Sequence, residues 1–507
     1  MAIEPDFTAF AEGYAQGRPQ VLFARLIADL ETPVSAYLKL AEGRQNAFLL
    51  ESVQGGETRG RYSIVGLKPD LIWRFRNGKA EINRQARANP EAFEPDAEKN
   101  PLASLRRLLK ETQMPLPAGL PPMAVGLYGY LGYDMVRLIE KLPNVPPDTL
   151  GLPDAILMRP SIVAIFDSIR DEIVIVSPVW PEAGIDARAA YARTSERIND
   201  AIADLERPLP ASPSLCEAAL ESSPAQSNMS HDEYIAMVGK AKEYILAGDI
   251  FQVVPSQRFR RPFKLPSFSL YRALRRLNPS PFLYHLALPG FSIVGSSPEI
   301  LVRLRDGKVT IRPIAGTRWR GKTPEEDKAL AEELQADPKE RAEHLMLIDL
   351  GRNDVGRIAK TGQVTVTDSF FIERYSHVMH LVSNVEGEIR DGLDAVDALA
   401  AGLPAGTLTG APKIRAMEII DEFEKEKRGA AYAGAVGYFA ADGSMDTCIM
   451  LRTALVKDGT MYVQAGGGIV ADSVPESEYQ ETVNKAKALM SAADEAVRFA
   501  STGKRGQ

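Results

Sequence analysis

The hydrophobic and polar positions of the first half alternate as in β-strands after a short helical start. Residues 34–40 follow a Thr-Pro helix start signal, and residues 61–66 then read as a strand. Residues 71–76 and 79–82 flank Asn77-Gly78, two residues that tolerate positive φ. This arrangement predicts a β-hairpin.

A stretch of the first half recurs in the second half. Residues 62–82 align without a gap on residues 291–311, and ten of the twenty-one positions are identical. Strand–turn–hairpin units resemble one another in general, but this many identities favour a duplicated substructure. We therefore predict an α+β fold in which two facing antiparallel β-sheets, one from each half, are flanked by helices.

The two halves are joined by a segment without periodicity. Residues 208–229 are rich in proline, serine and alanine, which indicates a linker. We expect an N-terminal regulatory or structural region over 1–222 and a catalytic region over 223–501. The charged run 421–428 reads as a solvated helix end without a function.

Composition places the chain among ordinary globular proteins. Of its 507 residues, 45% are hydrophobic and 25% are charged, and the length suggests two to four compact units. A net charge of −7 argues against a nucleic-acid-binding protein, which needs a basic face. Two cysteines make neither a disulfide framework nor a zinc site, the start is acidic, and no apolar run reaches membrane-spanning length. We expect a cytoplasmic protein.

Glutamates on two predicted helices are candidates for metal binding. One helix, begun by Asp337, carries Glu340 and Glu343 on one face, and a later helix carries Glu478 and Glu481 three residues apart. Together they could hold a hard cation such as Mg²⁺ through oxygen ligands. Acidic residues in the first turn of a helix also interact favourably with its dipole. The spacing alone therefore does not decide between a metal site and helix stabilisation.

Other candidate motifs are weaker. The glycines 466–468 lack the spacing of a dinucleotide loop, and residues 406–413 lack the spacing of a P-loop. Cys216 and Cys448 have no nucleophile context. His380 suits general acid–base chemistry near neutral pH, although a histidine beside a strand is more often a core residue.

Five motifs, in order along the chain, resemble those of the chorismate-utilising enzymes, and in detail the anthranilate synthase component I family. They are residues 313–318 (PIAGTR), 340–354 (ERAEHLMLIDLGRND), 377–380 (HVMH), 404–413 (PAGTLTGAPK) and 466–469 (GGGI). The resemblance implies the chorismate-utilising fold and a Mg²⁺-dependent carbon–oxygen lyase. Such an enzyme makes anthranilate and pyruvate from chorismate and ammonia in tryptophan biosynthesis.

The resemblance also assigns roles to residues. Glu343 and Glu481 would bind Mg²⁺ directly, with Glu340 and Glu478 holding its waters. His380 would transfer a proton at the ring, Glu299 would protonate the departing hydroxyl, and Thr407 would be a further catalytic residue that contacts the substrate. The implied substrate contacts are Gly316, Thr317, Tyr432, Arg452, Gly466, Gly467, Gly468 and Lys485.

Two positions separate relatives within the family. Aminodeoxychorismate synthases commonly carry lysine at Ala315, and isochorismate and salicylate synthases carry lysine at Gln252. Both internal nucleophile systems are therefore missing, which leaves external ammonia as the attacker. A 2-amino-2-deoxyisochorismate synthase would share both residues and remains the nearest alternative, and a non-catalytic relative that binds an aromatic ligand is another.

The resemblance implies a partner and a regulator as well. Neither cysteine lies in the nucleophile-elbow motif of a glutaminase. Ammonia would therefore come from a separate glutamine amidotransferase subunit, component II. A tryptophan inhibitor pocket is implied by residues 49–52 and 278–283, although the pattern of 49–52 alone reads as a plain strand. The implied inhibitor contacts are Glu51, Ser52, Pro281, Phe282 and Leu283, where the family usually has Tyr-Met at the last two positions.

Overall fold

The computed structural model describes the whole chain except residues 1, 55–57, 211–222, 376–377 and 503–507. Its helices are α1 (Phe7–Ala15), α2 (Pro33–Leu40), α3 (Pro101–Thr112), α4 (Ala187–Glu206), α5 (His231–Leu246), α6 (Ser267–Leu277), α7 (Pro324–Ala336), α8 (Pro338–Gly356), α9 (Ala395–Gly402), α10 (Lys413–Phe423) and α11 (Pro475–Thr502). The strands of the first half are β1 (Gln20–Ile27), β2 (Ala47–Gln54), β3 (Thr58–Arg76), β4 (Lys79–Asn83), β5 (Glu94–Pro95), β6 (Gly126–Leu131), β7 (Ala155–Asp167) and β8 (Glu172–Val179). The later strands are β9 (Gln226–Ser227), β10 (Gln252–Val253), β11 (Ser256–Pro262), β12 (Phe282–Leu288), β13 (Phe291–Ser297), β14 (Ile300–Arg305), β15 (Lys308–Ile311), β16 (Ile314–Trp319), β17 (Thr365–Arg374), β18 (Val378–Glu388), β19 (Gly410–Ala411), β20 (Ala435–Ala440), β21 (Met445–Ile449), β22 (Thr453–Lys457) and β23 (Thr460–Gly466).

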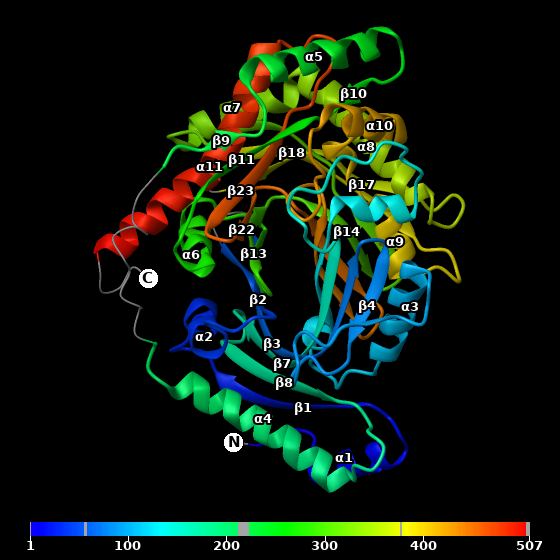
Figure 1. Ribbon diagram of the computed structural model, residues 1–507, viewed down its shortest axis with the longest axis vertical. Coiled ribbons are helices and arrows are strands. Elements are labelled where there is room, and N and C mark those ends of the chain that lie inside the picture. The colour runs from blue at the N-terminus through cyan, green and yellow to red at the C-terminus, as the bar shows by residue number, and fades with distance from the viewer. Residues whose placement is uncertain (1, 55–57, 211–222, 376–377, 503–507) are drawn as a thin grey trace.

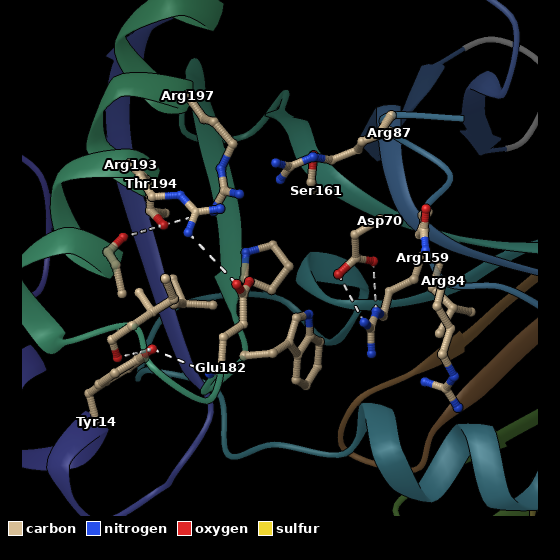
Figure 2. Close-up of a pocket in the computed structure, with 18 residues that line it drawn as sticks. Tyr14, Asp70, Arg84, Arg87, Arg159, Ser161, Glu182, Arg193, Thr194 and Arg197 are labelled. Carbon is tan, nitrogen blue, oxygen red and sulfur yellow. Dashed lines mark hydrogen bonds and ion pairs between the residues drawn. The ribbon is translucent and has the colours of Figure 1, made fainter. Parts of the chain in front are cut away.

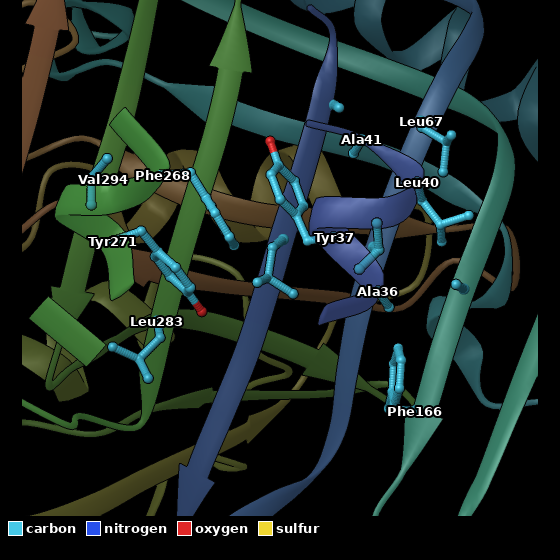
Figure 3. Close-up of a cluster of buried hydrophobic side chains, with 14 of the residues drawn as sticks. Ala36, Tyr37, Leu40, Ala41, Leu67, Phe166, Phe268, Tyr271, Leu283 and Val294 are labelled. Atoms are coloured by element: carbon cyan, nitrogen blue, oxygen red, sulfur yellow. The ribbon is translucent and has the colours of Figure 1, made fainter. Parts of the chain in front are cut away.

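The strands form two facing layers with helices on both outer sides (Figure 1). Side chains alternate along each strand, so Phe48 of β2 packs in the core between the layers while Leu49 faces the outer helices. In that outer core, Tyr37 of α2 stacks on Phe268 of α6 with ring centroids 4.2 Å apart (Figure 3). The prediction of facing antiparallel layers flanked by helices is confirmed.

The duplicated hairpin is present in both halves. The β3–β4 turn has Asn77 and Gly78 at φ 52° and 75°, and the β14–β15 turn has Asp306 and Gly307 at φ 50° and 73°. Positive φ at both central residues is the geometry of a type I′ hairpin. The two copies also share an irregularity just before the hairpin. In the first half, the pairing of β3 with β7 shifts register between Pro69 and Leu71, and in the second half the chain is interrupted between β13 and β14.

The expectation that each half supplies its own sheet is wrong. Strand β12 of the second half pairs with β2 of the first, and β20 pairs with β6. The ladders that the structure describes join twenty-one strands in one continuous antiparallel network. The division at residue 222 stays a prediction, because most of the expected linker lies outside the described residues.

The charged run 421–428 also differs from expectation. Glu424 and Arg428 form a buried ion pair, with nitrogen and oxygen 2.5 Å apart and side chains 3% and 1% exposed. A solvated helix end was predicted because charged residues mostly lie at the surface.

No described helix is long and apolar enough to cross a membrane.

Candidate active site

Most of the predicted site residues line one cavity of about 1170 Å³. Helices α8 and α11, the glycine end of β23, strands β16 and β18, and the turn η4 (Gly406–Leu408) border it. The predicted residues that line it are Gly316, Thr317, Glu340, Glu343, His380, Thr407, Arg452, Gly466, Gly468, Glu478, Glu481 and Lys485. Five sequence motifs therefore converge on one space.

Three predicted residues lie at the edge of this cavity. Glu299 is buried beside it and accepts a hydrogen bond from the Thr407 hydroxyl at 3.3 Å. Tyr432 is buried behind the glycines, with its hydroxyl 2.9 Å from where a Cβ on Gly466 would stand. Gly467 lies against Glu478, because a Cβ there would be 3.1 Å from the Glu478 Oε2.

Two helices bring the four predicted metal carboxylates to this cavity. Helix α8 begins where Asp337 accepts hydrogen bonds from the first backbone amides, and Glu340 and Glu343 follow on one face. Burial raises the pKa of Glu343 above its usual value, and the charges of Glu340 and Glu481 raise it further. Burial and the charge of Glu481 likewise raise the pKa of Glu478, while a hydrogen bond with Ser473 opposes this. Carboxylates from both helices therefore repel one another across the cavity.

Cations of the chain already neutralise part of this charge. Lys485 Nζ lies 2.6 Å from Glu481 Oε1, and Arg318 lies 3.1 Å from Glu340 Oε1. Across the described residues, no three histidine, cysteine, aspartate or glutamate side chains gather closely enough to hold a metal ion. The oxygen donors suit a hard cation, and the metal assignment stays a prediction.

Glu299 has the properties of a general acid. The residue is 7% exposed, and burial raises the pKa of its carboxyl group to about 8, against a smaller lowering by the Thr407 hydroxyl. Because this value exceeds neutral pH, Glu299 carries a proton there. A protonated carboxyl group next to a cavity can transfer that proton to a leaving oxygen.

His380 is neutral at the same pH. Burial lowers its pKa to about 4, the Gly316 carbonyl opposes this, and Arg452 adds to it. The ring Nδ1 lies 3.0 Å from the Gly316 carbonyl oxygen and 3.1 Å from the Thr317 hydroxyl. When Nδ1 donates to that carbonyl, Nε2 is left as a proton acceptor.

Arg452 supplies the positive charge that an anionic ligand needs. Burial lowers the pKa of its guanidinium, which Tyr375 partly restores, and no carboxylate pairs with it among the described residues. Its backbone has φ 47°, a conformation that few non-glycine residues adopt. Lys485 adds a second cation at the mouth and donates to the Gly466 carbonyl at 2.9 Å.

Sequence reasoning missed two contributors. Tyr375 lines the cavity, with its ring centroid 5.5 Å from that of His380, and only its position just before the histidine motif could have suggested it. Arg428 donates to the carbonyls of Leu408 and Val254 at 2.8 and 2.7 Å and so supports the wall of the cavity. His377 lies outside the described residues.

The predicted inhibitor residues meet in a separate cavity of about 540 Å³. Pairing of β2 with β12 sets Ser52 opposite Phe282 and Glu51 opposite Leu283, and Pro281 completes this wall. The Glu51 carboxylate is already bound by Arg275 at 2.7 Å and by the Tyr271 hydroxyl.

Asp446 is a second carboxylate of this cavity that the sequence did not point to. Its Oδ2 lies 3.0 Å from Arg303, whereas its buried Oδ1 has no hydrogen-bond partner among the described residues. A buried oxygen of this kind gains from a ligand that donates a hydrogen bond. Glu51 is thus engaged by donors of the chain on both oxygens, whereas one oxygen of Asp446 is left without a donor.

Known proteins resemble this chain over nearly its whole length. The sequence profile of the chorismate binding enzymes matches residues 46–491. Anthranilate synthase component 1 of Cereibacter sphaeroides is 61% identical, covering 97% of this chain and 98% of its own, and that of Pseudomonas aeruginosa is 50% identical, covering 95% and 96%. The crystal structure of anthranilate synthase component I from Streptococcus pneumoniae superposes with a TM-score of 0.74 at 37% identity, covering 92% of this chain and 99% of its own.

Proposed function

The chain belongs to the family of chorismate binding enzymes, and from this premise we propose that it is the large subunit of an anthranilate synthase. The reaction takes chorismate and ammonia to anthranilate, pyruvate and water. The relatives that match over nearly the whole length support this reaction rather than another of the family. We place the reaction in the cytoplasm, in line with the cysteine usage.

The observation that carries the proposal is the buried Arg452 without a carboxylate partner in the described part of the chain. Chorismate has two carboxylates, and a guanidinium binds one of them through two parallel hydrogen bonds. A substrate held there lies in the same cavity as His380 and beside the proton of Glu299. Acid, base and anion-binding group are therefore set around one ligand.

Each titrating residue then has one task. Glu299 gives its proton to the ring hydroxyl, which leaves as water when ammonia adds to the ring. His380 Nε2 accepts the ring proton when pyruvate is eliminated and the ring becomes aromatic. Thr407 holds the Glu299 carboxyl group in place through its hydroxyl.

We infer a Mg²⁺ ion from the oxygen donors that α8 and α11 bring to one cavity. Glu343 and Glu481 would bind it, with Glu340 and Glu478 holding its waters, and the like charges that raise the pKa of Glu343 support this placement. When bound, Mg²⁺ supplies positive charge that neutralises a substrate carboxylate.

Ammonia must come from outside this chain. Cys448 is buried in β21, where burial raises its pKa, so it is no glutaminase nucleophile. Cys216 lies outside the described residues. We infer a separate glutamine amidotransferase subunit as the partner.

The purified chain tests the proposal directly. With chorismate, Mg²⁺ and ammonium it is expected to form fluorescent anthranilate and one pyruvate per anthranilate, and with glutamine in place of ammonium it is expected to form neither. An Arg452→Gln variant is expected to lose activity mainly through a higher KM. Consumption of chorismate without pyruvate would instead identify a 2-amino-2-deoxyisochorismate synthase, and binding without turnover would contradict an enzyme.

Feedback inhibition by tryptophan belongs to the same proposal. The second cavity offers Phe282 and Leu283 as apolar walls for an indole, Ser52 as a hydrogen-bonding group and the free Asp446 Oδ1 for the ammonium group. Strand β16 and the segment before β12 each contribute residues to both cavities. A ligand in one cavity can therefore bias the wall of the other.

A further inference from the structure

A third cavity, of about 410 Å³, is lined by arginines and lies in the first half of the chain, between α4 and strands β3 and β7. Its arginines come from three separate segments and surround one space (Figure 2). They are Arg84, Arg87, Arg159, Arg193 and Arg197. The only carboxylates among the described lining residues are Asp70 and Glu182, so five positive charges face two negative ones.

Some of these arginines are already neutralised. Arg159 forms two hydrogen bonds of 2.8 Å with Asp70, and Arg193 lies 3.7 Å from Glu182. Arg84 pairs with Glu111 outside the cavity at 2.8 Å. These pairs use both carboxylates of the lining.

Arg87 and Arg197 remain without a carboxylate partner in the described part of the chain. Arg197 donates one hydrogen bond, to the Thr194 hydroxyl at 2.7 Å, while its buried Nε has no acceptor. Trp180 Nε1 is buried without an acceptor as well, and its ring lies 4.2 Å from the guanidinium carbon of Arg159. Unsatisfied buried donors are rare in folded proteins, and here two of them belong to one cavity lining.

The two carboxylates of the lining offset only part of the repulsion between the arginines. Burial lowers the pKa of Arg197 to about 10, and the charges of Arg87 and Arg193 lower it further, while those of Asp70 and Glu182 oppose this. A partly buried guanidinium normally has a carboxylate or phosphate partner, because its desolvation is otherwise uncompensated. The lining thus has the charge and the donors for an anion.

We propose that this cavity binds a small anion that carries a carboxylate or phosphate group, held by Arg87 and Arg197 and by the indole N–H of Trp180. Leu71, Pro178 and Val179 give the same cavity an apolar side, and the volume suits a small metabolite. Asp70, which lines this cavity, is the residue of the first repeat that aligns with Glu299 in the second. The cavity is separate from the chorismate and inhibitor cavities, with which it shares no lining residue.

Calorimetric titration with inorganic phosphate and with citrate, at constant ionic strength in chloride, tests this site. We expect saturable binding of at least one probe with a Kd below about 1 mM, and a loss of roughly tenfold or more in the Arg87→Gln, Arg197→Gln double variant. Tighter binding of phosphate would assign a phosphorylated ligand, and tighter binding of citrate a polycarboxylate. The control is Arg188→Gln, an exposed arginine of α4 outside this lining, which should bind like the unmodified chain.

A stability measurement separates loss of the site from loss of the fold. In anion-free buffer, Arg197→Gln is expected to melt no lower than the unmodified chain, because it removes a partly buried charge that Asp70 and Glu182 compensate only in part. Added anion is expected to raise the melting temperature of the unmodified chain and of Arg188→Gln, but not that of the double variant. The proposal is overturned if neither probe binds the unmodified chain, or if the double variant binds and shifts as the unmodified chain does.

Discussion

At the scale of single residues, burial gives three side chains of the chorismate cavity different protonation properties at one pH. It keeps Glu299 protonated, keeps His380 neutral, and leaves Arg452 charged but without a carboxylate partner in the described chain. Desolvation always disfavours the charged form, so it raises the pKa of an acid and lowers that of a base. An acid, a base and an anion-binding group therefore coexist near neutral pH.

Substitution of Glu299 by glutamine tests the acid. Because burial raises the pKa of Glu299 to about 8, kcat is expected to fall as the pH rises through that value. Glu299→Gln should lower kcat by about 10²–10⁴-fold and remove this limb of the pH–rate profile. The comparison is the profile of the unmodified enzyme, and an unchanged alkaline limb in the variant would contradict the assignment.

The same pKa predicts a stability effect of defined sign. The unfolded chain releases the Glu299 proton near 4.5, while the folded chain holds it to about 8. The contribution of this carboxyl group to the free energy of unfolding is therefore full below about 4.5 and declines as the pH rises to about 8. Glu299→Gln is expected to lack this decline in chemical denaturation measured between pH 5 and pH 9.

The metal prediction rests on Glu343 and Glu481. Glu343→Gln and Glu481→Gln each remove a charged oxygen ligand. Losing a group that only hydrogen-bonds to a metal ligand costs roughly 10–100-fold, so we expect turnover to fall by more than this in each variant. Rate against Mg²⁺ concentration, with melting curves to exclude unfolding, measures this. Glu332→Gln, an exposed glutamate of α7, is the control. Mg²⁺ curves that match the control in both variants would refute the metal site.

How far the site could be predicted depended on the kind of residue. Glu343 and His380 lie in recognisable motifs, Glu481 follows Glu478 by three residues on a predicted helix, and Arg452 was implied only by the family resemblance. The structure brings all four to one cavity. Asp446 was out of reach, because its unpaired oxygen arises from strand pairing that no local pattern reveals.

At the scale of elements, the segment before β12 lies between two cavities. Asn278 lines the proposed chorismate cavity, whereas Pro281 lines the proposed inhibitor cavity. Strand β16 is shared in the same way, with Ile314 in one lining and Thr317 in the other. A rigid strand shared by two sites is a physical basis for coupling between them.

Substitution of Ser52 tests this coupling. Ser52→Leu fills the inhibitor cavity, so the tryptophan concentration for half inhibition is expected to rise by roughly tenfold or more, with kcat unchanged. Ser52→Ala removes the hydroxyl without filling the space and should show a smaller rise. Full activity of the unmodified enzyme at saturating tryptophan would contradict the regulation itself.

Local elements were predictable where the signal was local. The helix predicted over residues 34–40 is present as α2, and the Asn77-Gly78 turn closes its hairpin. The order of the strands was not predictable, because antiparallel strands share the same period of two and pair equally well in several orders. The buried Glu424–Arg428 pair was missed for a similar reason, since its desolvation depends on distant segments.

At the scale of the whole molecule, the two halves are interleaved. Strands β2 and β12 pair along Ala47–Ser52 and Phe282–Ala287, and β6 pairs with β20 along its whole length. The core between the layers likewise combines side chains of both halves, such as Phe48 and Tyr128 with Tyr284. Neither half can therefore bury its own inner face alone.

The interleaving predicts how the chain folds when it is divided. Residues 223–501 expressed alone lack β2 and β6, so β12 and β20 would each expose an unpaired edge. We expect this fragment to aggregate or to unfold without a cooperative transition in circular dichroism, and to be inactive with chorismate and ammonium. Co-expression with residues 1–222 is expected to restore a soluble complex, because the missing strands then return. A fragment 223–501 that unfolds cooperatively and turns over chorismate would show instead that the catalytic region is an independent domain, and that pairing across the halves adds little to its stability.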